Sequence, residues 1–419
     1  MKSIPTLLVA ALITAIVPLR ADLVLKPNDM VAICGDSITE QRLYSAYMEE
    51  YFLMCRPAEG LRAAQFGWVG ETTGGFAARI ESDILPFKPT VVTTCYGMND
   101  GAYKAMTPHT GDVFRQATTT FVEKMKAGGV RAILLGSPGC VDSTAFWRPG
   151  ATADEYNKTL VALSDIAKEV ATKEGVTFVD MHTPMMDVMT KAKAAYGANY
   201  QFVTGIGVHP AGNGQIVMAY VFLKALGCDG AIGTITVDLA GGTATGTPGQ
   251  KIVSCQNGTV EVESTRYPFC FQGVPGKPGQ AEGNVLGFFP FNDDLNRYLL
   301  VVKGIKGAKA KVTWGTVTKE FPAADLAKGV NLAAEFLVNP FCSQFRKVDA
   351  AVQAQQAQES LFIRSLLHNV AMFKTIAPNS GAELDKVAAD GMAQETNLFT
   401  AAAALVVPVD HTIKIEQEP

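Results

Sequence analysis

The sequence predicts an α/β protein in which a parallel sheet is covered by helices on both faces, followed by a smaller β-rich unit and a helical region. Between residues 29 and 227, short apolar runs alternate with longer stretches of helical periodicity. After residue 228, apolar and polar residues alternate between Gly, Pro and Asn turns, and from residue 330 the composition turns to Ala, Gln, Leu and Lys. Strands that alternate with helices are typical of βαβ units, which form parallel sheets.

Five short apolar runs predict the strands of the parallel sheet. They lie at residues 30–34, 61–66, 90–96, 131–136 and 176–179. Because they occur within one alternating region, we expect them to form a single domain of ordinary size.

Three stretches between and after these runs predict helices. Residues 38–55 place apolar side chains at helical spacing. Thr152 and Glu155 form a capping box that opens a helix running to about Lys173. The stretch GQIVMAYVFLKALG ends on Gly227, a favourable helix C-cap.

The remainder of the chain predicts a second architecture. The alternation across 233–321 is typical of a small β-sandwich, and the helical pattern of 348–374 predicts a long helix that packs back on the first domain. We therefore expect four segments. They are a signal peptide at residues 1–21, an α/β domain at 22–228, a β-sandwich-like domain at 229–325 and a helical region at 326–419.

The first 21 residues have the pattern of a secretory signal. Lys2 is basic, residues 4–17 are apolar, and Ala21 is a small residue at a plausible cleavage point. The apolar stretch is too short to predict a membrane span. We therefore expect the mature protein to be secreted or periplasmic.

The net charge argues against nucleic acids and anionic membranes as partners. The formal charge of the whole chain is −4. Without the signal segment, which holds Lys2 and Arg20 and no acidic residue, 34 basic residues face 40 acidic ones, a charge of −6. Such a chain has no electrostatic reason to bind DNA, RNA or an anionic bilayer. The composition indicates no particular oligomeric state.

The eight cysteines are scattered and form no CxxC motif or Cys/His cluster, so no structural zinc site is expected. Cys34 and Cys95 lie in apolar runs, where a buried small hydrophobe is the favoured interpretation. Cys255 and Cys270 flank a predicted hairpin and are the one pair that we expect to form a disulfide.

Ligands of parallel α/β sheets bind at the carboxyl ends of the strands, and four loops near those ends hold suggestive residues. They are Gly35-Asp36-Ser37 after the first strand, GWVGETTGGF (67–76) after the second, YGMND (96–100) after the third, and GIGVHPAGNGQ (205–215) before the last helix of the domain.

Each loop has a functional and a structural interpretation. Ser37, at the start of a helix whose free N–H groups stabilise an anion, is either a nucleophile or an N-cap. Loop 67–76 either lets a backbone N–H approach a ligand or is simply a turn. Asn99 can donate its amide to a developing oxyanion, whereas Asp100 fits a helix cap. His209 is either a base or an ordinary surface or core histidine.

The order Ser, Gly, Asn, His of these loops resembles the SGNH (GDSL-type) hydrolase superfamily over about residues 31–226. The resemblance implies a flavodoxin-like three-layer α/β/α sandwich and a serine esterase that needs no cofactor and no metal. It implies that Ser37 is the nucleophile and that His209 takes its proton and later protonates the leaving alcohol. It also implies that Gly70 N–H, Asn99 and the Ser37 N–H form the oxyanion hole.

The sequence departs from this family three residues before the histidine, where Ile206 replaces the usual aspartate. That carboxylate orients the imidazole and stabilises its protonated form. Three alternatives follow: a Ser37/His209 dyad oriented by a backbone carbonyl, a carboxylate recruited from elsewhere, or a weakened relative. The replacement candidates are Asp36, Glu71, Asp100 and Asp180, although each also fits a role in a loop, a helix start or a strand end.

The leading functional hypothesis is a secreted esterase that removes O-acetyl or similar small acyl groups from glycans. The superfamily also contains lipases and lysophospholipases, and Ile206 favours a third hypothesis, a glycan-binding protein built on an impaired hydrolase. Trp147 and Arg148 are candidate substrate contacts, although an ordinary packed loop fits them better.

Overall fold

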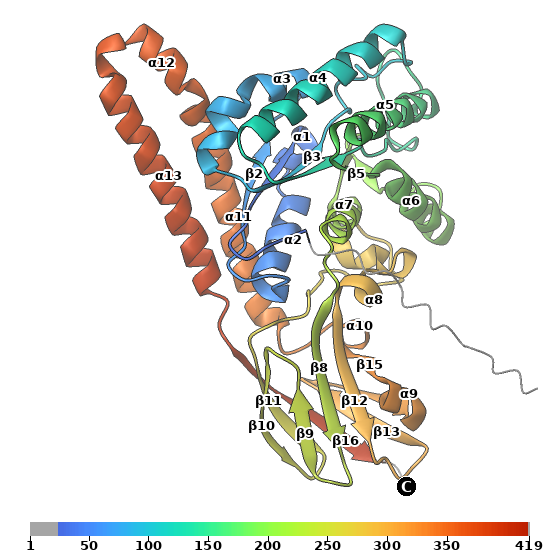
Figure 1. Ribbon diagram of the computed structural model, residues 1–419. Helices are drawn as coiled ribbons and strands as arrows, with labels where there is room; N and C mark the ends of the chain where they lie inside the picture. Colours follow the sequence, from blue (N-terminus) through green and yellow to red (C-terminus); the bar gives the residue numbers. More distant parts are fainter. Residues whose placement is uncertain (1–23, 418–419) are drawn as a thin grey trace, which may run out of the picture.

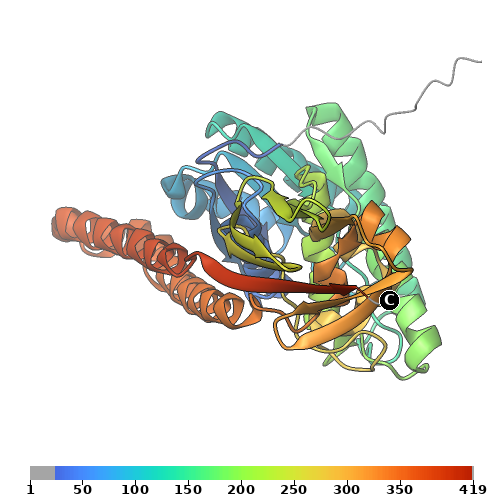
Figure 2. The ribbon, with the colours of Figure 1, turned by 90° about the horizontal axis from the view of Figure 1, so that it is seen from below.

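The computed structural model describes residues 24–417, and the predicted signal segment at residues 1–21 lies outside the described residues. An α/β sandwich forms one end of the molecule and two further sheets form the other (Figure 1). A long helix, α11 (Cys342–Ser365), runs along one side of the α/β sandwich, and a helical hairpin projects from the body (Figure 2).

The parallel sheet has the strand order β2-β1-β3-β4-β5. Its strands are β1 (Met30–Gly35), β2 (Arg62–Gly67), β3 (Val91–Cys95), β4 (Ala132–Gly136) and β5 (Thr177–Val179). Each of the five predicted runs overlaps one of these strands. The order is that of flavodoxin-like doubly wound sheets, so the predicted fold class is confirmed.

Side chains of each strand alternate between two helical layers. Val31 and Ile33 of β1 face one layer, and Ala32 and Cys34 face the other. The first layer contains α2 (Tyr44–Glu50), α6 (His182–Tyr196) and α7 (Gly212–Ala225), and the second contains α3 (Thr73–Arg79), α4 (Pro108–Ala127) and α5 (Ala153–Glu174). Both faces of the sheet are therefore buried, which explains the nearly continuous apolar character of its strands.

Two of the predicted helices have the expected ends. Thr152 and Glu155 form the capping box of α5, in which the Thr152 N–H donates to the Glu155 carboxylate at 2.8 Å. Gly227, two residues beyond α7, adopts a left-handed φ of 81°.

The single helix predicted at 38–55 is wrong, because the helix is interrupted near Arg42 and its last turn is π-helical. A short helix, α1 (Ser37–Glu40), is followed by Arg42 with a φ of 58°, and α2 passes into a π-helical turn at Tyr51–Cys55. The apolar spacing continues across the break because both segments face the same core. Ser37 consequently begins a helix of its own beside the end of β1.

The β-rich part contains two sheets. One has the order β10-β11-β16-β13-β14 and the other β15-β12-β8-β9. Their strands are β8 (Ala231–Asp238), β9 (Thr243–Gly246), β10 (Gln250–Gln256), β11 (Thr259–Ser264), β12 (Arg297–Lys303), β13 (Lys309–Trp314), β14 (Val317–Pro322), β15 (Val330–Asn331) and β16 (Val409–Gln417). Tyr298 of β12 stacks on Trp314 of β13 with ring centroids 5.5 Å apart, so the two sheets share one core.

The later helices are α11 (Cys342–Ser365), α12 (Val370–Ile376) and α13 (Gly381–Ala404). As expected, α11 packs back on the first part of the chain, against α2 and β2. The helical region predicted at 326–419 also contains β16, whose side chains alternate between buried and exposed and whose backbone pairs with β11 and β13. One hydrophobic cluster joins the parallel sheet to both later sheets, so the predicted domain boundaries at 228 and 325 stay predictions. No helix between residues 24 and 417 is long and apolar enough to cross a membrane.

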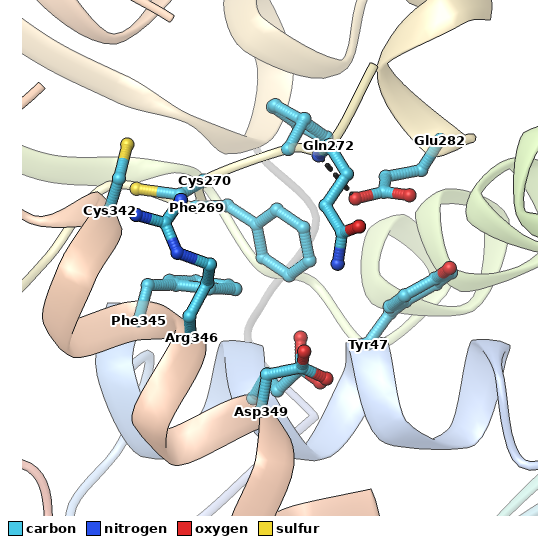
Figure 3. A pocket seen from close by; sticks show the side chains of 11 residues that line it. Tyr47, Phe269, Cys270, Gln272, Glu282, Cys342, Phe345, Arg346 and Asp349 are labelled. Atoms are coloured by element: carbon cyan, nitrogen blue, oxygen red, sulfur yellow. Dashed lines mark hydrogen bonds between the residues drawn. The ribbon is translucent and has the colours of Figure 1, made fainter. Parts of the chain in front are cut away.

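The predicted Cys255–Cys270 disulfide is wrong, since all eight cysteines are free thiols. Cys255 lies on β10, whereas the chain after β11 turns towards the α/β sandwich and buries Cys270 beside Cys342 of α11. The Cys270 and Cys342 thiols line a cavity of about 30 Å³ (Figure 3). The same cavity is lined by the acidic side chains of Glu50, Glu282 and Asp349.

Candidate active site

Ser37 and His209 are 172 residues apart in the sequence and lie in direct contact. The distance between Ser37 Oγ and His209 Nε2 is 2.8 Å. Ser37 begins α1, and the Asp36 carboxylate caps that helix by accepting a 2.9 Å hydrogen bond from the backbone N–H two residues on. Gly35 is required before them, because a Cβ there would lie only 2.0 Å from the Thr39 hydroxyl.

A tight turn brings His209 to the serine. His209 pairs with Thr204 in a two-stranded ribbon, and the turn between them contains Gly205 and Gly207 with φ of 64° and 75°. A Cβ at Gly207 would lie 2.4 Å from the backbone nitrogen of Phe146. The histidine loop is thus pressed against the loop at 142–148, and only glycine fits that contact.

Ile206, at the position where the family usually has aspartate, is half-buried against the core, and its carbonyl accepts a 3.4 Å hydrogen bond from Trp147 N–H. Within residues 24–417, the side-chain hydrogen bond of His209 is the one to Ser37. The charged neighbour of the ring is Arg148. Burial and this cation both lower the pKa of His209, so its neutral, proton-accepting form is favoured.

The four carboxylates considered as replacements are engaged elsewhere. Asp36 caps α1, Glu71 is bound by Arg79 and Tyr96, Asp100 accepts from the backbone N–H groups of Thr73 and Gly97, and Asp180 accepts from that of Thr183. None of the four is hydrogen-bonded to the His209 ring in the described part of the chain. Burial raises the pKa of Asp36 to about 7 and that of Asp100 to about 6.

The three donors expected to form the oxyanion hole belong to Ser37, Gly70 and Asn99, which follow the ends of β1, β2 and β3. As the first residue of α1, Ser37 has no intrahelical acceptor for its N–H. Gly70, with a φ of 70°, is exposed, and a Cβ there would meet nothing within 4 Å. The Asn99 amide is fixed at both ends, since its Nδ2 donates to the Glu71 carbonyl at 3.0 Å and its Oδ1 accepts from Tyr103 at 3.0 Å. One amide hydrogen of Asn99 is left for a ligand.

A buried ion pair, which sequence reasoning missed, holds the Gly70 loop in place. Arg79 binds the Glu71 carboxylate through two hydrogen bonds of 2.6 and 2.7 Å, and the Tyr96 hydroxyl donates to the same carboxylate at 2.6 Å. Arg79 falls on the apolar face of its helix beside Phe76, a position that signals a buried and paired charge. The network ties the loop after β2 to the end of β3, and so fixes two of the three donors relative to each other.

Aromatic side chains and one cation border the site. Tyr103 and Phe146 both pack on Tyr156, with ring centroids 5.1 and 5.8 Å apart. The Arg148 guanidinium lies over the face of Tyr103, 4.3 Å from the ring centroid, and Trp147 beside it is 74% exposed. Residues 146–148 therefore lie against the histidine loop, and two of them have side chains available to a ligand.

Comparisons with known proteins show which family and which proteins the chain is similar to. Residues 33–215 match the GDSL-like Lipase/Acylhydrolase family. The acetylxylan esterase of Geobacillus stearothermophilus is 25% identical over 187 residues, which are 44% of this chain and 80% of that protein. The solved structure of a gut microbial diltiazem-metabolizing enzyme has a TM-score of 0.73 and 21% identity, and the match covers 94% of this chain and 98% of that one. This last likeness extends the shared fold to nearly the whole chain.

Proposed function

We propose that this carboxylic ester hydrolase, whose residues 33–215 match the GDSL-like Lipase/Acylhydrolase family, removes small acyl groups from carbohydrates. The acyl group is above all O-acetyl, and Ser37 is the nucleophile. The 2.8 Å hydrogen bond between Ser37 Oγ and His209 Nε2 carries the proposal. It places a base within reach of the hydroxyl proton at the end of the sheet where ligands of this fold bind.

The proposed reaction uses side chains and backbone of this chain. Ser37 Oγ attacks the ester carbonyl carbon while His209 Nε2 takes its proton, and the resulting oxyanion accepts hydrogen bonds from the N–H groups of Ser37 and Gly70 and from Asn99 Nδ2. His209 then protonates the leaving sugar hydroxyl, which leaves the acyl group on Ser37. Water, deprotonated by His209, attacks this acyl-enzyme and releases the carboxylic acid and Ser37.

Of the three alternatives for Ile206, the geometry supports a dyad. The neutral form of His209 is favoured without a carboxylate, and the four candidate carboxylates are occupied. The histidine turn, packed against residues 142–148, fixes the backbone at His209, and the hydrogen bond to Ser37 holds the ring. The missing carboxylate matters most for stabilising the imidazolium, so we expect a slower enzyme than a full triad would give.

Three observations support a carbohydrate substrate outside the cytoplasm. The related protein from Geobacillus stearothermophilus is an acetylxylan esterase. Exposed Trp147 offers the flat apolar face on which sugar rings pack. The basic, apolar and small residues of the first 21 positions support export, as a secreted or periplasmic protein.

The test is hydrolysis of 4-nitrophenyl acetate by the mature protein and by Ser37→Ala, together with labelling by a fluorophosphonate. We expect activity and labelling in the wild type and neither in the variant. Faster hydrolysis of the acetate than of the octanoate would support a small acyl group, and acetate release from acetylated xylan would support a glycan. A wild type as inert as Ser37→Ala would contradict the assignment of the nucleophile.

A further inference from the structure

Arg148 lies at the edge of the candidate site with its charge uncompensated by a carboxylate contact in the described part of the chain. Its Nε atom is buried and has no hydrogen-bond partner among residues 24–417. The acidic side chain nearest in the loop, Asp142, is already bound by Lys193 and by the N–H of Thr144. A buried donor of a charged group without a partner costs free energy, which a ligand can recover.

The position of Arg148 is fixed by Tyr103, which leaves most of the guanidinium donors unused. The guanidinium stacks on the face of Tyr103 at 4.3 Å, a contact that holds the planar group through its π-face. The N–H donors of arginine lie in the plane of the guanidinium, so the donors that do not reach the Tyr103 hydroxyl, Nε among them, stay free at its edges. Planar donors in this arrangement match the two oxygens of a carboxylate.

Arg148 is also connected to the reacting groups. Tyr103, on which it lies, donates through its hydroxyl to Asn99, one of the proposed oxyanion donors. On the other side, the Arg148 charge reaches His209 and lowers the pKa of that ring. In the free enzyme a cation therefore lies near the base, and no carboxylate among residues 24–417 is hydrogen-bonded to the His209 ring.

From this geometry we propose that Arg148 binds a carboxylate of the substrate, so that the enzyme acts on acylated sugar acids such as hexuronic acids. The inference rests on the proposed function and names the substrate class of that site. The substrate carboxylate would neutralise Arg148 when the ester is in place, and so remove the penalty that Arg148 imposes on the imidazolium. Trp147 would support the sugar ring that carries both groups.

The test compares matched substrates that differ only in charge. These are the acetylated methyl glycosides of galacturonic and glucuronic acid and the corresponding uncharged uronamides, with acetate release as the readout. We expect kcat/KM of the wild type to favour the acid by about 10- to 100-fold, the range of a hydrogen-bonded charge. The preference should shrink at high ionic strength.

Substitutions of Arg148 test whether this residue causes the preference for the acid over the amide. Arg148→Gln should bring the acid-to-amide ratio close to one, and Arg148→Lys, a point charge without the planar donors, should keep part of it. The matched control is Arg115→Gln, which removes the same charge from an exposed ion pair with Asp112 and Glu169 on α4 and α5 and should leave the ratio unchanged. Because the ratio is internal to each variant, a general loss of activity does not affect it.

A binding measurement decides the inference independently of catalysis. Calorimetry with the Ser37→Ala protein should show tighter binding of the deacetylated methyl uronosides than of their uronamides, and Ser37→Ala/Arg148→Gln should abolish the difference. Equal rates and equal binding for acid and amide, or a preference that survives Arg148→Gln, would overturn the inference. Hydrolysis of 4-nitrophenyl acetate that depends on Ser37 would then still support the esterase proposal, while its absence would count against that proposal alone.

Discussion

His209 lies between a serine that it contacts and an arginine that repels its protonated form. Burial and Arg148 both lower the pKa of His209. The ring must be neutral to accept the Ser37 proton, so kcat/KM should fall only when the pH drops below the usual histidine value of about 6.5.

The pH profile of kcat/KM for 4-nitrophenyl acetate tests this effect, because its acid limb reports the pKa of the free enzyme. We expect the limb to lie below pH 6.5 in the wild type and to move upwards in Arg148→Gln, where the repelling charge is gone. An unchanged limb in Arg148→Gln would show that burial alone sets the pKa. The control is Arg115→Gln, in which the limb should stay in place.

Asn99 should act on the transition state rather than on substrate binding. Its Nδ2 has one hydrogen free, and its orientation is fixed by Glu71 and Tyr103. Asn99→Ala should lower kcat by about 100-fold or more with little change in KM, the effect of removing one oxyanion donor. Asn99→Asp keeps the size but cannot donate, so it should lose at least as much. Equal losses in kcat and in substrate affinity would contradict the assigned role.

At the level of secondary structure, α11 packs on the α/β sandwich through apolar side chains and also through several buried polar ones. The Glu49 carboxylate accepts hydrogen bonds from Gln355 and Gln356 at 2.8 and 2.7 Å, and Glu359 accepts from the Gln65 backbone at 2.5 Å. Both glutamates are almost fully buried. Burial raises the pKa of Glu49 to about 7 and raises that of Glu359 well above its usual value.

This interface predicts a protein that loses stability as the pH rises. A carboxyl whose pKa is raised in the folded state stabilises the fold when protonated, so its contribution is complete below about pH 4.5 and declines up to and beyond pH 7. For Glu49 the loss is about 3 kcal/mol at most. The midpoint of urea unfolding should fall between pH 5 and pH 8, and Glu49→Gln, which resembles the protonated carboxyl, should reduce the fall. A midpoint equally sensitive to pH in the variant would contradict this account.

Local patterns predicted some elements and not others, for identifiable reasons. The parallel strands are continuous apolar runs buried on both faces, and the α5 capping box is a local signal, so both could be found from the sequence. The break at Arg42 has no local signal, because apolar spacing continues across it. β16 was missed because this alternating strand of nine residues follows directly on a long helical region. In the site, the order of four loops and the family that it resembles indicated Ser37, Gly70, Asn99 and His209. The proximity of Arg148 to His209 depends instead on the packing of two loops.

In the whole molecule, β16 joins the end of the described chain to the middle of a sheet formed largely by earlier residues. It lies between β11 and β13, with Ile413 fully buried and Thr412 exposed on the opposite face. Ile413→Asn removes a core side chain and buries an amide without a partner, which should cost about 4 kcal/mol. Thr412→Asn should change stability by no more than about 0.5 kcal/mol. Thermal unfolding of both variants measures the difference, and similar losses would show that β16 is peripheral to stability.

The central place of β16 also has a consequence for biosynthesis. Ser264 on β11 pairs with Val409 on β16, so about 145 residues must leave the ribosome between the two partners. The α/β sandwich, complete in sequence by about residue 227, can fold while β11 and β13 still present unpaired backbone edges. During that interval the nascent chain exposes strand edges to which other unfolded chains can bind. Until residue 417 has emerged, the edges of β11 and β13 are therefore the segments that a chaperone would need to protect.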